Sequence, residues 1–232
     1  SAMINILSIH SQNSDDDLVQ FTAITWLKEF VSLAGSTNVL QFAAGILIAI
    51  LPCLSQNPCI NEETEDGRHR TVTNNNTREV AKALNDSLMH LITQDEQRDE
   101  ISSTATNDDR NSTVNIRTNG PYNPIDLASV VEVLATELKK GPNASTQAKV
   151  AVLRWIFHLQ NKLPDKMTSH LEDEFFPLLL QTLCDLSDEV VLVTLEDLAQ
   201  IFNYNTTATS NEIANFPPTF FSKFMLSLLQ LF

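Results

Sequence analysis

Two short stretches decide how this sequence folds: Ala23–Phe30 reads AITWLKEF, and Val152–Leu159 reads VLRWIFHL. Each places a tryptophan at the same point of an apolar pattern that recurs with the period of an α-helix. Further along, Leu51–Ser55 reads LPCLS and Leu183–Ser187 reads LCDLS, so a second pair of segments matches in the same order. This ordered agreement predicts a chain built from repeated helical units.

A third pair supports the repeat, because Ala83–Asp86 (ALND) matches Thr194–Asp197 (TLED) after the first two matches. Helix pairs that recur at roughly 40 residues are typical of armadillo and HEAT solenoids. Each pair buries its apolar side only by stacking on its neighbours. We therefore expect an all-α, HEAT/armadillo-type solenoid of about four helix pairs, with a globular helical bundle as the alternative.

Composition agrees with a helical fold, and the net charge disfavours some classes of binding partner. The chain has 5 glycines and 2 tyrosines, too few for the turns and aromatic runs of a strand protein. Its formal net charge is -14, whereas nucleic-acid binding rests on lysine and arginine contacts to phosphate. Direct binding to nucleic acid or to an anionic membrane is therefore disfavoured.

Apolar periodicity predicts which side of each helix is buried. Val39–Leu54 is apolar nearly all round, closed by Pro52, and at about 16 residues too short to span a bilayer, so we expect a core helix. The other predicted buried faces are Val19, Ala23, Trp26, Phe30 and Ala34; Val80, Leu84, Leu88 and Leu91; Leu127, Val130, Val131, Leu134 and Leu138; Ala148, Ala151, Val152, Trp155 and Leu159; Val191, Leu195, Leu198 and Phe202; and Phe224, Leu228 and Leu231.

Start and stop signals place the helix ends. Asn76 is expected to cap one helix with Glu79 reaching back, Asn123 followed by Pro124 to cap the next, and Ser145 to open a third. Helix breaks are expected at Gly35, at Gly141–Pro142 and at Pro164. A further helix is expected over Leu171–Leu186. The helix that follows it is expected to be capped by Ser187 or Asp188.

Three polar segments interrupt the helices. Residues 56–75 and 94–122 are expected to be flexible insertions, because side chains such as those of Gln94–Gly120 offer almost nothing apolar to offset the entropy of ordering. Residues 203–216 are expected to be a polar linker. We treat 1–232 as a single solenoid fragment.

A search for chemistry finds no site. The sequence has no nucleotide-binding or nucleophile-elbow motif. Cys53, Cys59 and His69 fit no zinc spacing, and the carboxylates of Glu172–Glu174 suit a helix start better than acid–base work. His90 and His158 are expected at helix surfaces, and Trp26 and Trp155 in the core. We therefore predict no enzyme, no catalytic, cofactor-binding or metal-binding residue and no cofactor, and we assign no partner-binding residue. Three scattered cysteines, an odd number with no disulfide-framework spacing, favour a reduced, cytoplasmic environment.

The runs Phe42–Leu54, Leu84–Leu91 and Val152–Leu198 resemble the ArPIKfyve vacuole-morphology scaffold family. The resemblance covers most of the sequence outside the insertions, which depart from the family pattern. It implies a middle portion of a longer HEAT-repeat protein. It also implies a non-catalytic scaffold that holds the kinase making phosphatidylinositol 3,5-bisphosphate together with a Sac-type lipid phosphatase on endosomes and vacuoles.

The same resemblance implies self-association through regions absent from this chain, and a membrane location reached only through the partners. A HEAT-repeat adaptor of trafficking or transport, unrelated to the lipid kinase, is the alternative. Two lysine pairs, Lys139 with Lys140 and Lys162 with Lys166, are the expected basic patches of an otherwise acidic chain.

Overall fold

The computed structural model describes residues 2–13, 15–34, 39–55, 75–92 and 126–207, together with the single positions 222, 226 and 229. The chain forms two compact units, Ser1–Val130 and Val131–Phe232, which are described separately. The single-domain prediction is not tested by this division and stays a prediction. The predicted insertions lie outside the described residues, except that residue 75 begins a helix.

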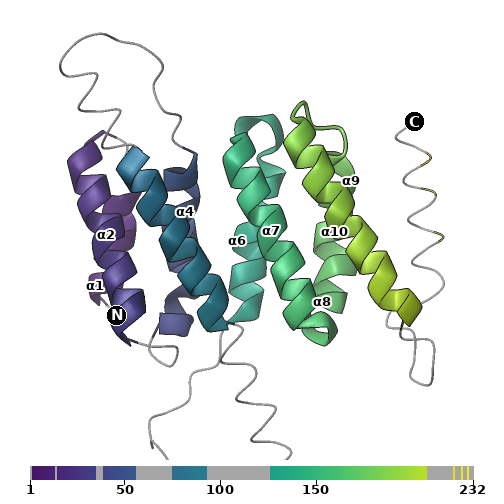
Figure 1. The fold of residues 1–232 in the computed structure, drawn as a ribbon, viewed down its shortest axis with the longest axis horizontal. Coiled ribbons are helices and arrows are strands. Elements are labelled where there is room, and N and C mark those ends of the chain that lie inside the picture. The colour runs from purple at the N-terminus through teal and green to yellow at the C-terminus, as the bar shows by residue number, and fades with distance from the viewer. Residues whose placement is uncertain are drawn as a thin grey trace, which may run out of the picture. The chain divides into compact units, whose positions relative to one another are not determined.

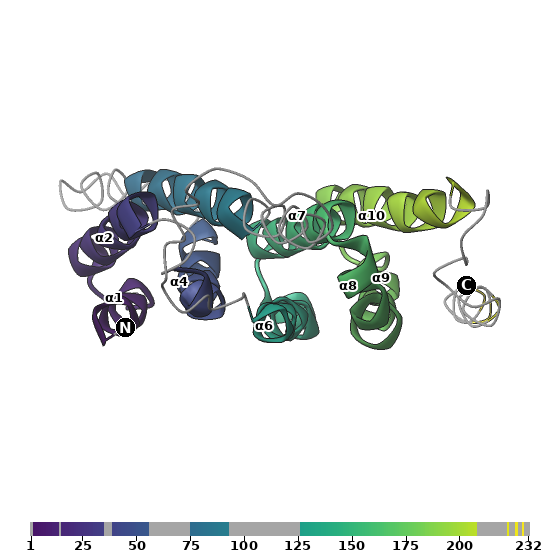
Figure 2. The ribbon, with the colours of Figure 1, turned by 90° about the horizontal axis from the view of Figure 1, so that it is seen from below.

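Unit 1 contains α1 (Ala2–Ser11), α2 (Asp17–Ala34), a 3₁₀ turn (Leu40–Phe42) running into α4 (Ala43–Leu54), and a helix over residues 75–92. Helix α1 packs against both α2 and α4 (Figure 1). In Figure 2, α1 and α4 form one row of this unit, while α2 and the helix over 75–92 form the other.

Buried polar contacts join the helices of unit 1. The Gln20 side chain donates to the carbonyl of Ser11 across 2.9 Å, which ties the start of α2 to the end of α1. The thiol of Cys53 donates to the same carbonyl at 3.4 Å and to that of Ala49 at 3.3 Å. Burial raises the pKa of Cys53 to about 12, so this thiol is a packed, protonated core group.

Unit 2 contains most of α6 (Leu127–Lys139), then α7 (Thr146–Lys162), α8 (Pro164–His170), α9 (Phe176–Thr182) and α10 (Asp188–Thr207). A π-helical turn, Leu171–Phe175, joins α8 to α9. Helix α10 packs along α7 and also touches α9, where the Thr182 and Thr194 hydroxyls lie 3.0 Å apart. Figure 2 shows α7 and α10 in one row and α6, α8 and α9 in the other.

The predicted all-α fold of stacked helices is confirmed, since the described ranges contain no strand and each unit packs helices that are near in sequence. The HEAT type of the repeat stays a prediction. Several predicted ends are also confirmed: Ser145 caps α7 by accepting from the Ala148 N–H at 3.1 Å, and Gly141, with φ +54°, ends the preceding helix. Pro164 lies just beyond the end of α7, and α10 begins after Ser187.

Other predicted boundaries are wrong. The helix predicted from Leu171 to Leu186 begins earlier, at Pro164, because proline suits a first helical turn and the π turn carries the helix onward. It ends at Thr182. Pro52 lies inside α4 instead of closing it. Asn76 lies within the helix over 75–92 and does not precede it, and Glu79 pairs with Lys82 at 2.8 Å.

Two more predicted segments differ at their ends. The predicted cap Asn123 lies outside the described residues; α6 starts at Leu127, where the Asp126 carboxylate accepts from the Ser129 N–H at 3.2 Å. The predicted linker over 203–216 is wrong for its first residues, because α10 continues to Thr207. The remainder of that segment and the last predicted helix lie outside the described residues.

Four long helices share one phase of burial: α2, the helix over 75–92, α7 and α10. Each buries residues at a first position and then four, seven and eleven positions on, which is one side of an α-helix. The sets are Gln20, Ile24, Leu27 and Val31; Thr77, Ala81, Leu84 and Leu88; Ala148, Val152, Trp155 and Leu159; and Val190, Thr194, Asp197 and Ile201. We call this shared pattern the common register.

The common register corrects two predicted alignments. Leu27, not Trp26, occupies the place of Trp155, so Trp26 is 54% exposed while Trp155 is fully buried. Asp197, not Leu195, occupies the place of Leu84, and Leu195 is 49% exposed. A helix turns about 100° per residue, so a slip of one or two residues moves a predicted core face outward. Most of the predicted buried faces of α6 and α7 are confirmed.

We expect Leu198→Ala to destabilise the protein by about 2–5 kcal/mol, because this side chain is buried and its loss leaves a cavity. Leu195→Ala, the same change three residues earlier on the exposed side of α10, should cost less than about 1 kcal/mol. Urea denaturation of both variants measures the difference. Equal losses of stability would contradict the common register.

Candidate functional site

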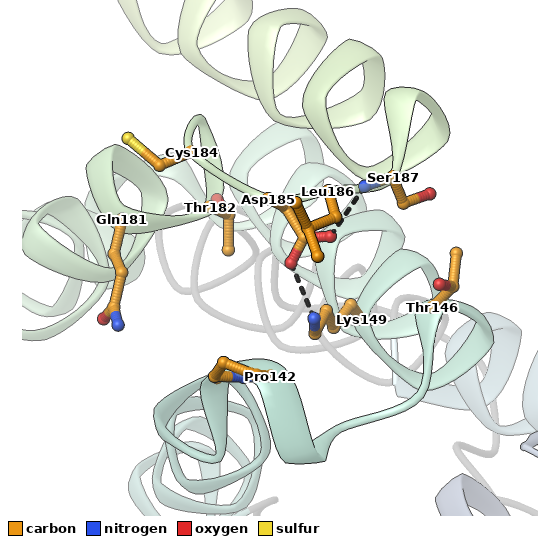
Figure 3. A pocket seen from close by; sticks show the side chains of 10 residues that line it. Pro142, Thr146, Lys149, Gln181, Thr182, Cys184, Asp185, Leu186 and Ser187 are labelled. Atoms are coloured by element: carbon orange, nitrogen blue, oxygen red, sulfur yellow. Dashed lines mark hydrogen bonds and ion pairs between the residues drawn. The ribbon is translucent and has the colours of Figure 1, made fainter.

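A hollow of about 450 Å³ lies in unit 2. Three turns of chain meet around it: the Gly141–Pro142 turn, the first turn of α7 at Thr146, and the connection between α9 and α10 (Figure 3). Gln181 and Cys184 also line it. A Cβ atom at Gly141 would lie 3.9 Å from the Gln181 amide nitrogen, which is an ordinary contact, so it is the positive φ of Gly141 that favours glycine there.

A buried ion pair lies in the wall of this hollow. Lys149 Nζ lies 2.6 Å from Asp185 Oδ2, and the two side chains are 7% and 15% exposed (Figure 3). Asp185 Oδ1 accepts from the Ser187 N–H at 3.0 Å. Burial opposes ionisation of Asp185, but the hydrogen bonds from Lys149 and Ser187 outweigh it and hold its pKa below the usual value.

The Lys149–Asp185 pair fixes local geometry. It joins the first turn of α7 to the connection that leads into α10, so the entry of α10 is set by a charge-assisted contact. Because the two charges neutralise each other, this pair presents no net charge to a ligand in the hollow. No histidine or second carboxylate lines it, so its lining holds no acid–base pair for catalysis.

Asp197 is a second buried charge-bearing group, 1% exposed on α10. Neither of its carboxylate oxygens has a hydrogen-bond partner among the residues that the structure describes. Burial, helped by the neighbouring charge of Glu196, raises its pKa to about 8. Asp197 is therefore mostly protonated at neutral pH, and in the common register it occupies the place held by Leu27, Leu84 and Trp155 in the other long helices.

Exposed apolar side chains gather on three helices. They are Met3, Ile6 and Ile9 on α1, Leu18, Trp26 and Leu33 on α2, and Leu192 and Leu195 on α10. In unit 1 a second hollow, of about 330 Å³, lies between α1 and α2. Clustered exposed apolar groups of this kind mark protein-contact surfaces.

The residues weighed for chemistry do not form a site in the described part of the chain. Cys53 is buried, while Cys59 and His69 lie outside the described residues. Within the described ranges no three histidine, cysteine or acidic side chains come together as a metal site. The acidic run Glu172–Glu174 lies in the π-helical turn, where Glu174 approaches His170 at 3.3 Å.

The histidines and lysines singled out in the sequence are exposed or half-buried in the structure. His90 is exposed and His158 is half-buried. Lys139, Lys140, Lys162 and Lys166 are exposed, and Lys140 pairs with Glu137. The absence of catalytic, cofactor-binding and metal-binding residues stays a prediction.

Sequence reasoning missed Lys149, Asp185 and Asp197. Lys149 could have been noticed as a charge inside the apolar run AKVAV, and Asp197 only by aligning the long helices in the common register. Among the described helices, none is long and apolar enough to cross a membrane.

Two curated proteins are similar to this chain along most of its length. A VAC14 homolog of Schizosaccharomyces pombe is 31% identical over 215 residues, which are 93% of this chain and 21% of that protein. A VAC14 homolog of Arabidopsis thaliana is 29% identical over 183 residues, 79% of this chain and 18% of that protein. The chain thus spans about a fifth of these relatives. No family model and no solved structure matches it.

Asp197 should make stability fall as pH rises. An unfolded aspartate loses its proton near pH 4, whereas folded Asp197 keeps it to about pH 8. Between these values the folded chain binds the extra proton, so the free energy of unfolding should drop by about 1 kcal/mol per pH unit. We expect Asp197→Leu to lose this component and to be more stable than the wild type at neutral pH, as measured by urea denaturation across this range.

Glu196→Gln, an exposed change beside Asp197, is the control and should keep most of the pH dependence. An unchanged pH dependence in Asp197→Leu would show that another group is responsible.

Removing one partner of the buried ion pair should be costly. Asp185→Asn alone should destabilise by about 3–5 kcal/mol, because the Lys149 ammonium is left buried without its partner. Lys149→Met should cost less, because Asp185 is part-buried and keeps its hydrogen bond from the Ser187 N–H. The double variant should lose less than the sum of the two. Additive losses in a thermal or urea double-mutant cycle would argue against coupling between these side chains.

Proposed function

Because this chain belongs to the VAC14 homolog family, we propose that it is a non-catalytic scaffold segment that binds other proteins. It spans about a fifth of the length of the two relatives. The observation that carries this proposal is the match to a VAC14 homolog over 93% of the chain. The stacked helices fit the role, since a helical stack offers long, rigid surfaces for partners.

The partners we propose are those that the family resemblance implies: the phosphatidylinositol 3-phosphate 5-kinase and a Sac-type lipid phosphatase. Holding two enzymes of opposite effect on one scaffold raises the effective concentration of each at the other. The scaffold then acts by position, with catalysis left to the bound enzymes and no cofactor of its own. Control of phosphatidylinositol 3,5-bisphosphate would follow from the assembled complex.

We propose that the protein is cytoplasmic and reaches endosomal and vacuolar membranes through these partners. A net charge of -14 opposes direct approach to anionic lipid. The exposed lysines on α6, α7 and α8 could each contribute about 1 kcal/mol near such a surface, and salt weakens this attraction. Self-association would involve regions outside this chain.

We expect the tagged chain, or a longer form of it, to capture the kinase and the phosphatase from cytosol. The captured proteins are identified by mass spectrometry, with the tag alone as the control. Recovery of trafficking adaptors or cargo without either enzyme would favour the unrelated-adaptor function instead. Hydrolase, kinase or lipid-modifying activity in the purified chain would contradict the non-catalytic role.

The purified chain should also remain near background in co-sedimentation with phosphoinositide vesicles at physiological salt, because its charge opposes binding. Neutral vesicles and low-salt buffer serve as comparisons. Tight binding that survives physiological salt would contradict the proposed indirect route to membranes and favour direct lipid sensing.

A further inference from the structure

Helix α2 carries an apolar stripe on its outer side. Trp26, Phe30 and Leu33 are spaced by four and three residues, so they lie along one line of the helix. Trp26 is 54% and Leu33 84% exposed, and Phe30 is half-buried. An exposed tryptophan within such a stripe is the kind of side chain that anchors protein interfaces. We call Trp26, Phe30 and Leu33 the α2 stripe.

The common register shows that this stripe is a feature of α2 and not of the repeat. The places of its three residues are taken by polar, charged or small side chains in the other long helices. These are Ala83, Arg154 and Glu196 at the place of Trp26, Ser87, His158 and Gln200 at that of Phe30, and His90 and Asn161 at that of Leu33. Helix stacking therefore does not require apolar groups at these places.

Neighbouring helices also leave these places open. Helix α10 packs along α7, and yet Arg154 and Asn161 on α7 and Glu196 on α10 remain exposed. The stacking contact lies on other sides of the two helices. A helix stacked on α2 in the same way would leave Trp26 and Leu33 uncovered, so the α2 stripe suits a different kind of contact.

An apolar hollow continues the stripe toward the start of α2. This hollow of about 330 Å³ is lined by Leu7 and His10 of α1 and by Leu18, Val19, Thr22 and Ala23 of α2. Val19 and Ala23 extend the line of the α2 stripe. From Val19 to Leu33 the surface is about 21 Å long, at about 1.5 Å per residue, which is the length of a four-turn helix.

The surroundings of this surface favour a basic ligand. Asp15 and Asp16 are exposed at the start of α2, and Asp17 is in its first turn. Glu29 is exposed beside the α2 stripe, where its carboxylate forms an exposed ion pair with Lys28 at 3.5 Å. The carbonyl end of a helix carries partial negative charge, here near Leu33. The whole chain adds a net charge of -14.

We propose that the α2 stripe and its hollow bind an amphipathic helix of a partner protein, with apolar residues at helical spacing and flanking lysines or arginines. The apolar side of the helix would lie along Trp26, Phe30 and Leu33 and place one side chain in the hollow. The flanking cations would face the aspartates and Glu29. This inference deepens the scaffold function and rests on it, because it names the kind of partner segment that unit 1 holds.

The test is a titration of the full chain with a helix-stabilised synthetic peptide of about 15 residues, a length matched to the surface. It has leucines at helical spacing and lysines on either side, and a second peptide replaces the lysines by glutamates. We expect micromolar binding of the lysine peptide by fluorescence anisotropy, and binding at least about tenfold weaker for the glutamate peptide. Binding should also shield Trp26 from acrylamide quenching, while buried Trp155 is unaffected.

Matched variants locate the site. Trp26→Glu and Leu33→Asn introduce residues found at the same register places in other helices, so both should fold, and each should weaken peptide binding at least about tenfold. Ala83→Glu adds the same charge at the corresponding exposed place of the helix over 75–92 and should leave binding within about twofold. Circular dichroism confirms that each variant is folded.

The inference would be overturned if neither peptide bound, if both peptides bound equally, or if Trp26→Glu left binding unchanged. It would also be overturned if the wild-type chain formed a dimer that Trp26→Glu dissociates, because the occupant would then be a second copy of the chain. The titration is repeated on the complete protein, where loss of binding would also overturn the inference, because another part of the chain would then cover the stripe. The assay needs neither enzyme, so capture of the kinase without peptide binding would reject the docking site and leave the scaffold function standing.

Discussion

The structure depends on one constraint, which is that each long helix must bury the same side along its whole length. Residues at a first position and then four, seven and eleven positions on are buried in α2, in the helix over 75–92, in α7 and in α10. Trp155 and Leu84 fill equivalent places in this register. Because stacked helix pairs share their core with their neighbours, a helix turned by even one residue would expose apolar surface and bury polar groups.

Ionisable side chains enter the core of unit 2 in two different ways. Lys149 and Asp185 enter as a pair, with the Ser187 N–H completing the hydrogen bonding, so the pair specifies how α10 begins. Asp197 enters alone and keeps its proton at neutral pH, because a buried carboxylate without a partner is far less stable than the acid. The Lys149–Asp185 contact orders the start of α10, whereas Asp197 is expected to make the stability of unit 2 depend on pH.

The register also separates two kinds of surface on the long helices. One side of each long helix is used by the stack, and the outer positions are left for solvent or for partners. On α7 and α10 those positions are polar or charged at Arg154 and Glu196, whereas on α2 they hold Trp26 and Leu33. Under the proposed scaffold function such differences between repeats matter, because an identical surface on every repeat would give a partner no unique place to bind.

The sequence by itself determined that the chain is helical, that α4 is a core helix, and where Ser145, Gly141 and Pro164 start or stop helices, since these depend on local propensity and apolar content. It also determined the family resemblance. It did not determine the phase of burial of α2 and α10, because both have apolar residues on more than one side. Only the packing of neighbouring helices decided that Leu27 is buried and Trp26 exposed, and that Asp197 is buried where Leu195 had been expected. A turn of about 100° per residue makes that choice sensitive to a slip of one residue, which local pattern alone does not resolve.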